Sequence, residues 1–586
     1  MHISFRFLKP RRKSETLGLI FLGIMAIVVL RLFFIQIIQH SYYTQKAYQQ
    51  QVAKFILPAT RGEIYAKQGN SIVPLVLNQP VYLAYADPQQ VGDKAKLEKI
   101  IQTIASGNVV DGYQDSLKST RLRYVVLARD LSYDQATALK KQNLPGVGLT
   151  QTDQRVYPEG DLASQVLGYV NNDAQGQYGV EQALNSRLKG VDGKLQTVTD
   201  VRRIPLTVGK DDISVPARNG QNLALSIDVN VQAYVEAALK RGLDNVHATI
   251  GNAIVMNPNN GQIIAMANDP TYDPSNYDKV TDYSVFQNGV ASAPYEAGSV
   301  MKTLTIASGL DAGAITPSTT YTNLGYVDVD GIRMNNVEGD PTSTHTTMTN
   351  ILQYSLNTGA VFVLQQLGGG QVNLQARNKL YDYFTNHYGF GKTTGVELAD
   401  ESPGLIIPPT AVQGNNVRYA NMAFGQGFEV TMLQMAAAFS AAVNGGIYYQ
   451  PTVLAGTTND GQNVQTQAAK VVRKNVVQPN VSAELRTMIV QARQLSALGG
   501  KDQAGYIVGG KTGTSQTVDP ATGAYTNNNA VGSYLGFGGN QTPQYVIMIQ
   551  VKNSQAPGYA GSVAAAPIFT DISNWLINYL KIPPVS

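Results

Sequence analysis

A serine and a lysine stand one helical turn apart at the head of a largely apolar run, Tyr295 to Leu310. Residues three apart lie on one face of a helix, so the amine of Lys302 can reach the hydroxyl of Ser299. A serine becomes a useful nucleophile when a base takes its proton, and a lysine is such a base once burial or a second cation favours its neutral form. The pair predicts covalent acyl transfer, with Ser299 as nucleophile and Lys302 as base.

Two further motifs indicate whether the Ser299/Lys302 pair belongs to an active site. S-x-N occurs at Ser355 and Asn357, and K-T-G occurs once, beginning at Lys511. Taken singly, each motif is equally typical of a helix N-cap, a turn or a hairpin. The same letters also recur without an evident role: S-x-x-K at Ser186/Lys189 and S-x-N at Ser106/Asn108. Only Ser299, Ser355 and Lys511 follow the order of the penicillin-recognising serine enzymes, and this ordered set predicts an active site.

The remaining motif residues have predicted roles in the same reaction. Ser355 relays a proton to the leaving amine, while Asn357 orients Lys302 and bonds a substrate amide. A second cation, Lys511, helps to hold Lys302 neutral and attracts an anionic substrate terminus. Each role depends on the three motifs meeting in space.

The stretch from Gly505 to Ser515 predicts an edge strand that binds substrate. Its paired glycines permit close approach of a second backbone. Thr512, Gly513 and Thr514 are the candidate substrate-binding residues, since the two threonines can bond a carboxylate. The backbone N–H groups of Ser299 and Thr514 are the candidate oxyanion hole.

These side chains need a scaffold, and the sequence predicts one from about Asn219 onward. A strand is followed by Asp228 as N-cap and by an amphipathic helix, and residues 252–268 read as two strands joined by an Asn-Gly hairpin turn. Tyr545–Val551 predicts a strand and Ile568–Ile582 a helix. The predicted fold class is α+β, with an antiparallel sheet flanked by helices.

The segment before residue 219 changes character often. It contains an extended stretch at Val81–Pro88 and a charged helical patch at Lys94–Ile104. Short mixed elements with few apolar faces predict an elongated spacer rather than a catalytic module. The predicted domains are a basic tail at 1–16, a membrane helix at 17–38, a pedestal at 39–218 and a catalytic domain at 219–586.

The apolar run from Leu17 to Ile38 is long enough, at about 33 Å of helix, to span a bilayer. Basic residues precede it, which predicts a cytoplasmic N-terminus and an extracytoplasmic catalytic domain. A cleaved signal peptide is the alternative, but no A-x-A pattern follows the run. Arg31 interrupts the apolar run near its outer end. Its side chain either extends to the membrane interface or contacts a partner helix.

Composition excludes several other classes of function. The net charge is +4, and the five basic residues that precede Glu15 alone supply +5, so the rest is close to neutral and a nucleic-acid partner is not expected. There are no cysteines and only five scattered histidines, which disfavours thiol chemistry and a metal site. No metal and no organic cofactor are predicted.

The ordered motifs behind a single apolar anchor resemble the class B penicillin-binding proteins, the D,D-transpeptidases that crosslink peptidoglycan. The resemblance covers almost the whole chain. Arg61–Asn70 looks like the family's R-G-x-I-x-D-R-x-G box, and two later segments match its R-x-Y-P-x-G and G-x-E boxes, including Arg155, Gly179 and Glu181. Ala423–Ala436 and Gly532–Gly539 are similar to its later signatures.

The resemblance implies a penicillin-binding fold, which is an α/β sheet region beside an all-helical region, carried on a pedestal. It implies that Ser299 attacks a peptidoglycan stem peptide, releases D-Ala and is acylated by β-lactams. Ala84–Val91 and Ser402–Pro409 look more like the division-specific, FtsI-like branch than the elongation branch. That branch implies a SEDS-type glycan polymerase and other divisome membrane proteins as partners.

The chain departs from the family pattern at two places outside the catalytic groups. Ala66 and Lys67 stand where the family usually has Asp-Arg, which puts a structural ion pair of the pedestal in doubt. Ala297 replaces the usual proline before the Gly-Ser pair.

Three other functions share parts of this pattern. An elongation-specific transpeptidase has the same motifs. A D,D-carboxypeptidase or β-lactamase-type hydrolase also shares them but needs a positioned water. A divisome scaffold would not need Ser299, Lys302 and Lys511 intact, and a β-lactam sensor would need a signalling domain, for which the short basic cytoplasmic tail leaves no room.

Overall fold

The computed structural model of this chain describes residues 13–198, 213–337, 340–518, 525–558 and 561–585. The first twelve residues of the predicted basic tail lie outside this description, so its cytoplasmic location stays a prediction. The chain forms two compact units, residues 1–59 with 190–219, and residues 60–189 with 220–586.

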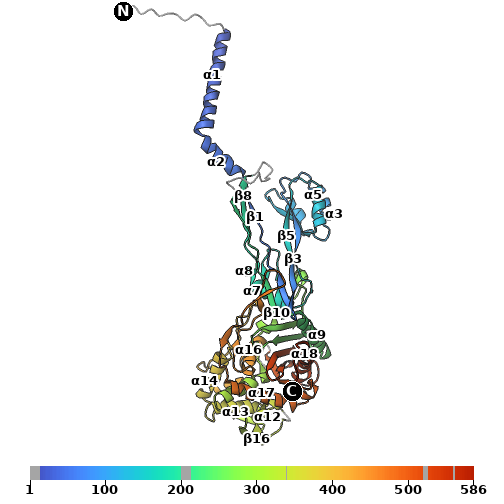
Figure 1. The fold of residues 1–586 in the computed structure, drawn as a ribbon, viewed down its shortest axis with the longest axis vertical. Helices are drawn as coiled ribbons and strands as arrows, with labels where there is room; N and C mark the ends of the chain where they lie inside the picture. The colour runs from blue at the N-terminus through green and yellow to red at the C-terminus, as the bar shows by residue number, and fades with distance from the viewer. Residues whose placement is uncertain (1–12, 199–212, 338–339, 519–524, 559–560, 586) are drawn as a thin grey trace, which may run out of the picture. The chain divides into compact units, whose positions relative to one another are not determined.

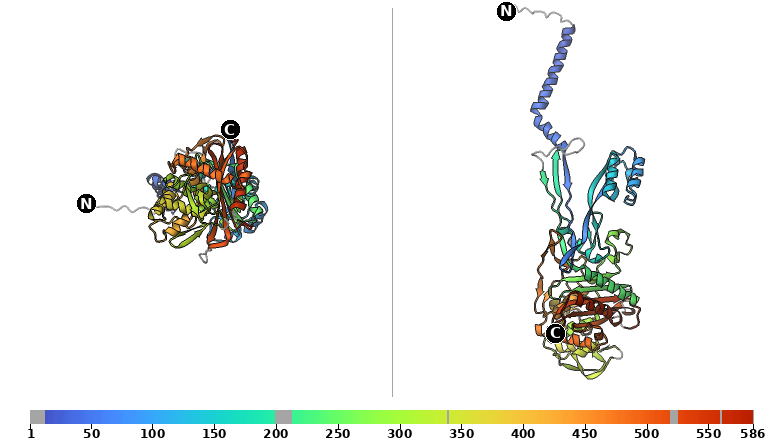
Figure 2. Two further views of the ribbon diagram at one scale, coloured as in Figure 1. Left: turned by 90° about the horizontal axis from the view of Figure 1, so that it is seen from below. Right: turned by 45° about the vertical axis from the view of Figure 1, so that its right-hand side comes forward.

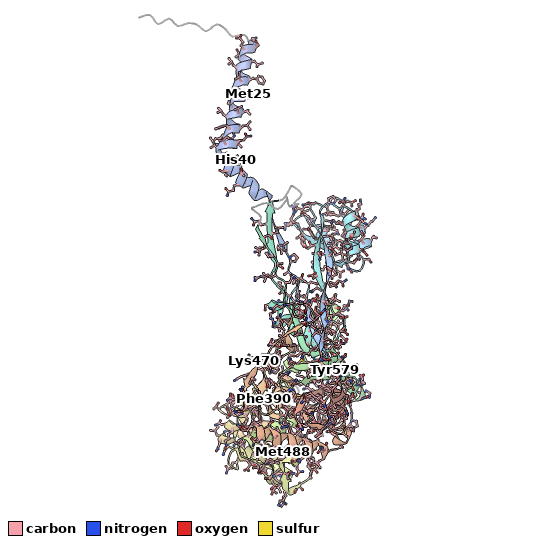
Figure 3. All side chains as sticks on the ribbon, viewed as in Figure 1. Met25, His40, Phe390, Lys470, Met488 and Tyr579 are labelled. Carbon is pink, nitrogen blue, oxygen red and sulfur yellow. The ribbon has the colours of Figure 1, made fainter. Side chains whose placement is uncertain are left out.

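The first unit contains the apolar helix predicted from the sequence. α1 spans Lys13–Phe33 and continues as the π-helical turn Phe34–Ile38, which together are long and apolar enough to cross a membrane. None of the α1 side chains is buried, as at Met25 in Figure 3. The unit also contains α2 and one three-stranded sheet: α2 His40–Gln51, β1 Val52–Leu57, β8 Gly193–Val198 and β9 Ile213–Val215.

The second unit holds two large sheets. In the first, the strand order is β19-β18-β10-β2-β3-β4, and β5 also pairs with β3. Its strands are β2 Ile64–Gln68, β3 Ser71–Ala86, β4 Val125–Leu131, β5 Val147–Val156, β10 Asn222–Asp228, β18 Leu454–Thr458 and β19 Val464–Thr466. β10 runs parallel to β2, so this sheet joins strands from both sides of the predicted domain boundary at residue 219.

A small lobe is built on the β3, β4 and β5 part of this sheet (Figures 1 and 2). Its helices are α3 Lys94–Ile104, α4 Tyr113–Leu117 and α5 Tyr133–Lys141. The predicted helical patch therefore coincides with α3. The prediction of few apolar faces is wrong, because Leu97, Ile101, Leu127 and Leu139 belong to a buried apolar cluster between these helices and the sheet.

A buried ion cluster ties three parts of this region together. The carboxylate of Glu181 accepts hydrogen bonds from Arg61 and from Arg155, with 2.7 Å between Arg155 Nη2 and Glu181 Oε1. Glu181 is fully buried, so each charge depends on its partners. The family box thus forms its ion pairs through Arg61 and Glu181, whereas Ala66 is buried and Lys67 donates to Gln262.

Glu181→Gln is expected to destabilise the protein by about 3 kcal/mol, because it leaves two buried guanidinium groups without a counter-charge. The thermal midpoint of unfolding measures the loss. Glu159→Gln, an exposed carboxylate in the same region, is the matched control and should leave the midpoint unchanged. Equal midpoints for the two variants would contradict this account of the ion cluster.

The second sheet is antiparallel, in the order β12-β11-β23-β22-β21. Its strands are β11 Ile250–Met256, β12 Ile263–Asp269, β21 Ile507–Val518, β22 Tyr525–Gly539 and β23 Pro543–Lys552. Both faces are covered, since alternate residues such as Val255 and Ile254 belong to different buried clusters. This confirms the predicted α+β class, and β21 is an edge strand as predicted.

Helices α9 Val229–Asn245 and α18 Ala566–Tyr579 lie side by side on one face of this sheet (Figure 1). α16 Met432–Val443 lies on the other face, and every one of its residues is buried. As predicted, Asp228 caps α9, because its carboxylate accepts from Asn230 N and Val231 N. The predicted Asn-Gly turn is wrong in detail: β11 and β12 pair, but six residues connect them.

The remaining helices of the catalytic region form the predicted helical part around α11. They are α10 Gly289–Ser292, α11 Lys302–Asp311, α12 Met348–Gln353, α13 Asn357–Leu367, α14 Leu374–Asp382, α15 Asn416–Ala423 and α17 Pro479–Gln494. Phe390 and Met488, labelled in Figure 3, are buried in its core. Three two-stranded sheets, β13-β16, β14-β15 and β17-β20, complete this part. Their strands are β13 Thr320–Asn323, β14 Tyr326–Val329, β15 Ile332–Asn335, β16 Ser343–Thr347, β17 Tyr448–Tyr449 and β20 Val471–Arg473.

Short elements link these parts in sequence. They are α6 Ser164–Leu167, β6 Tyr169–Val170, β7 Gly176–Gln177, α7 Gly179–Ala183 and α8 Asn185–Leu188 in the first region. In the catalytic region they are 3-10 turns at Pro274–Lys279, Tyr283–Phe286, Gly298–Met301 and Gly499–Lys501, and π-helical turns at Tyr383–His387 and Gly561–Ala565.

Candidate active site

Ser299 lies in the 3-10 turn Gly298–Met301, directly before α11. Gly298 has a φ of +61°, a conformation that glycine adopts without steric cost. Ser299 is partly exposed, whereas the α11 residues that follow are buried almost to the end of the helix. The turn therefore presents one hydroxyl to solvent at the head of a buried helix.

Lys302 is completely buried and its amine points at the other motif residues. Its Nζ lies 3.0 Å from Ser299 Oγ, 2.7 Å from Asn357 Oδ1 and 3.3 Å from Ser355 Oγ. It also contacts the carbonyl oxygen of Ser355. Because burying an amine without partners is costly, these oxygens are what allow a lysine at this position.

Burial lowers the pKa of Lys302 well below its usual value, since the charged form loses its hydration. The nearby cation Lys511 lowers this pKa further, and the carboxylate of Asp340 opposes both effects. A lysine with a depressed pKa is neutral for a larger fraction of the time at pH 7. It can then accept a proton from the hydroxyl that it contacts.

Ser355 lies in the short connection from α12 to α13, and Asn357 is the first residue of α13. Ser355 has a φ of +60°, which is strained for a residue with a side chain and is often found at functional sites. Asn357 Nδ2 donates to the carbonyl oxygen of Asn335 at 2.9 Å, which fixes the amide so that its oxygen faces Lys302. Both side chains are partly exposed.

The K-T-G motif lies in the middle of edge strand β21. Lys511 and Gly513 are buried and Thr512 and Thr514 are partly exposed, as expected from the alternation of a strand. Lys511 Nζ donates to the carbonyl oxygen of Thr512 at 3.0 Å. Burial lowers the pKa of Lys511 to about 7, opposed by Asp340.

Strand β21 also lies against the Ser299 turn. A Cβ added to Gly298 would be 2.9 Å from the carbonyl oxygen of Thr514. The N–H and C=O groups of one residue in an antiparallel strand point to the same side. The N–H of Thr514 therefore faces the Ser299 turn, as an oxyanion-hole donor must, and the assignment of Ser299 N and Thr514 N to that hole stays a prediction.

The structure brings all the sequence-predicted site residues into one place and adds two that the sequence analysis missed. Asp340 is the carboxylate that influences both lysines. Gly425 packs against the nucleophile turn, because Gly298 N donates to its carbonyl oxygen at 2.9 Å. No local pattern marks Asp340, whereas Gly425 lies within a segment already matched to a family signature.

A serine at the head of a buried helix, a lysine beside it and a Lys-Thr-Gly edge strand define the class of penicillin-recognising serine enzymes. The comparison with protein families agrees. The penicillin-binding protein transpeptidase domain matches residues 251–574, and the penicillin-binding protein dimerisation domain matches residues 56–225. The chain therefore belongs to the class B penicillin-binding proteins.

Known proteins resemble the chain over nearly its whole length. Stage V sporulation protein D of Bacillus subtilis is 29% identical, over 98% of this chain and 86% of that protein. The peptidoglycan D,D-transpeptidase FtsI of Escherichia coli is 26% identical, over 98% of this chain and 95% of that protein. The crystal structure of penicillin-binding protein 3 from Mycobacterium tuberculosis, complexed with aztreonam, shares the fold with a TM-score of 0.67 at 24% identity, covering 91% of this chain and 98% of that one.

Gly425→Ala is expected to slow acylation of Ser299 by about a hundredfold, because small displacements of reacting groups have effects of this size. Its new Cβ would lie 1.9 Å from the carbonyl oxygen of Gly298, so the nucleophile turn must move. The rate of covalent labelling by a fluorescent penicillin measures the effect.

Gly445→Ala is the matched control for this variant. Gly445 has a φ of +98°, close to the +97° of Gly425, but an added Cβ there meets no atom within 4 Å. Both variants carry the same backbone strain, about 1 kcal/mol, but only Gly425→Ala displaces the turn that contains Ser299. Similar labelling rates in the two variants would refute the positioning role of Gly425.

Proposed function

We propose that this chain is a membrane-anchored serine D,D-transpeptidase that crosslinks peptidoglycan stem peptides through an acyl-enzyme on Ser299. The observation that carries the proposal is the 3.0 Å contact between Ser299 Oγ and the amine of the fully buried Lys302. The similarity to relatives such as the E. coli peptidoglycan D,D-transpeptidase FtsI supports the substrate class.

In the proposed reaction, Ser299 Oγ attacks the carbonyl carbon of the penultimate D-Ala while its proton passes to neutral Lys302. The N–H groups of Ser299 and Thr514 bind the resulting oxyanion. The bond to the terminal D-Ala then breaks, and the leaving amine takes the proton from Lys302 by way of Ser355. The products of this half-reaction are free D-Ala and an ester on Ser299.

An amine from a neighbouring stem peptide completes the reaction. It attacks the ester carbonyl, its proton returns through Lys302 to Ser299 Oγ, and an amide crosslink forms. Lys511, Thr512 and Thr514 are proposed to bind the terminal carboxylate of the first peptide, and Gly513 lets the peptide backbone approach the strand. A β-lactam would acylate Ser299 in the same way.

The cellular setting is part of the proposal. The basic residues ahead of α1 favour a cytoplasmic N-terminus with the catalytic region outside. The motif resemblance of Ala84–Val91 and Ser402–Pro409 to the division-specific branch supports a septal role, with a SEDS-type glycan polymerase as membrane partner. A fluorescent fusion tests this role: we expect it at midcell, and an even lateral distribution would count against it.

Product analysis tests the reaction. The full-length protein in detergent is incubated with glycan polymer made from lipid II and with a donor peptide, and the products are identified by mass spectrometry. Crosslinked dimers are expected, whereas tetrapeptide alone would indicate a carboxypeptidase. Penicillin should modify the tryptic peptide that contains Ser299, and modification elsewhere would contradict the assignment of the nucleophile.

A further inference from the structure

A row of buried polar residues crosses the antiparallel sheet on the face that carries the active site. Five residues stand directly opposite one another on its five strands: Asn268 on β12, Asn252 on β11, Gln550 on β23, Ser533 on β22 and Gly513 on β21. All five are buried. Directly opposed residues of an antiparallel sheet project to the same face, so this polar row ends at the K-T-G strand beside the nucleophile turn.

The next row on the same face is apolar, which makes the polar row an exception. It consists of Met266, Ile254, Met548 and Leu535, and it ends at Lys511. A buried polar group without a partner destabilises a protein. Gln550 is such a case: its Oε1 accepts from Asn252 Nδ2 at 3.0 Å, but its Nε2 has no hydrogen-bond partner in the described part of the chain. Residues that break the rules of a stable core are typical of functional sites.

Ser533 lies where the K-T-G strand meets the nucleophile turn. A Cβ added to Gly513 would be 2.3 Å from Ser533 Oγ and 3.2 Å from the carbonyl oxygen of Ala297. The Ser533 hydroxyl therefore occupies space that only a glycine in β21 leaves open. The segment that leads into Ser299 packs against the same point.

Tyr295 approaches this point from the segment before Ser299. Its backbone is held by Val430, with 3.0 Å between Tyr295 N and Val430 O. Burial raises the pKa of the Tyr295 phenol, and the neighbouring hydroxyl of Ser533 opposes that rise. The Tyr295 hydroxyl completes no hydrogen bond within the described residues, so the two hydroxyls are neighbours whose bond is not fully formed.

Ala297 leaves the nucleophile turn less constrained than a proline would. Its φ is −61°, the value at which a proline ring fixes the backbone, but an alanine is free to leave this conformation. This is the position at which the chain departs from its family's usual proline. The geometry of the turn therefore depends more strongly on the contacts that surround it.

We propose that Tyr295 and Ser533 are positioning residues for acylation. Their hydroxyls form a hydrogen bond that holds the nucleophile turn against Gly513, and this bond keeps Ser299 Oγ aligned with the predicted oxyanion donor, the N–H of Thr514. Hydrogen bonds of catalytic sites are often long without substrate and shorten when it binds, which agrees with the incomplete bond in this structure. The inference rests on the proposed function, because it concerns the nucleophile of the same reaction.

Tyr295→Phe and Ser533→Ala test this link, since each removes one hydroxyl. Stopped-flow labelling of the full-length protein in detergent, at increasing concentrations of a fluorescent penicillin, gives the dissociation constant of the non-covalent complex and the acylation rate constant separately. Each variant is expected to lower the rate constant by about tenfold and to leave the dissociation constant unchanged, because a loosened turn misplaces the reacting atoms without removing contacts to the inhibitor. Titration with penicillin counts the competent sites.

A double variant and a rescue variant distinguish one shared link from two separate effects. Tyr295→Phe combined with Ser533→Ala should be about as slow as either single variant, because both changes remove the same bond. Ala297→Pro alone should acylate at the wild-type rate. Added to Ser533→Ala, it should restore the rate constant to within about threefold of wild type, because a proline stiffens the turn by itself.

The matched controls remove hydroxyls that are equally buried elsewhere. Tyr157→Phe removes a phenol hydroxyl that has no hydrogen-bond partner in the described part of the chain. Ser440→Ala removes a buried hydroxyl that contacts Met256 Sδ at 3.8 Å. Both controls should acylate at the wild-type rate, whatever the change in their thermal midpoints.

The outcomes separate this inference from the proposed function. The inference is overturned by a wild-type rate constant in either single variant, or by a weaker non-covalent complex with an unchanged rate constant. It is also overturned if the two effects multiply in the double variant, or if Ala297→Pro fails to rescue Ser533→Ala. In all these cases the transpeptidase assignment stands. Absence of penicillin labelling in the wild type overturns the proposed function itself.

Discussion

Replacing Lys302 with methionine is expected to slow acylation of Ser299 by about a thousandfold, within the range that a general base contributes. Methionine has a similar length and fills the same space, but it cannot accept the proton of Ser299. Acylation becomes slower in this variant, but the folded protein is not expected to become less stable. Removing a buried amine relieves its desolvation, so the thermal midpoint should equal or exceed that of the wild type.

Stopped-flow labelling with a fluorescent penicillin measures the rate, and Ser299→Ala gives the zero level of covalent labelling. A thermal scan of the same samples measures stability. Slow acylation without loss of stability would separate a catalytic lysine from a structural one. Near-wild-type acylation in Lys302→Met would show that another group is the base.

The contrast between Lys302 and Lys189 shows what spacing alone can predict. Both lysines follow a serine by three residues, yet Ser186 and Lys189 are exposed, whereas Lys302 is fully buried. Burial of one and not the other depends on helices and strands far away in the sequence. The order of the three motifs selects the pair whose lysine contacts the other motif residues in the structure, because that order carries information about one shared site.

Local signals also predicted much of the scaffold. The cap at Asp228, the helix at Lys94–Ile104 and the edge strand β21 follow from side chains close in sequence. The six-residue connection between β11 and β12 could not be predicted from such local signals, because Asn260-Gly261 also fits a tight turn. Only the pairing register shows that the chain turns more widely.

Long-range contacts account for most of what the sequence could not predict. The parallel pairing of β10 with β2 and the cluster of Glu181 with Arg61 and Arg155 join residues more than twenty positions apart in sequence. The family boxes contain the three charged residues, but no local pattern shows that they meet. The same holds for Asp340, whose carboxylate acts on both Lys302 and Lys511. These features depend on how distant loops pack together.

The second large effect concerns pH, and the two lysines act in opposite directions. Lys302 must be neutral to accept a proton, so kcat/KM should rise with pH through its depressed pKa. Lys511 must be charged to bind the substrate carboxylate, and burial lowers its pKa to about 7. Above that value kcat/KM for a D-Ala-D-Ala peptide should fall by about tenfold per pH unit.

Lys511→Arg separates the rise of kcat/KM with pH, assigned to Lys302, from its fall at higher pH, assigned to Lys511. These are the rising and the falling limb of the pH profile. A guanidinium stays charged at every pH of the assay, so the falling limb should disappear, while the rising limb of Lys302 is kept. The measurement is D-Ala release between pH 5 and 10, normalised by penicillin titration. A falling limb of equal steepness in Lys511→Arg would mean that a group other than Lys511 loses its proton there, and the proposed binding of the carboxylate by Lys511 would have to be abandoned.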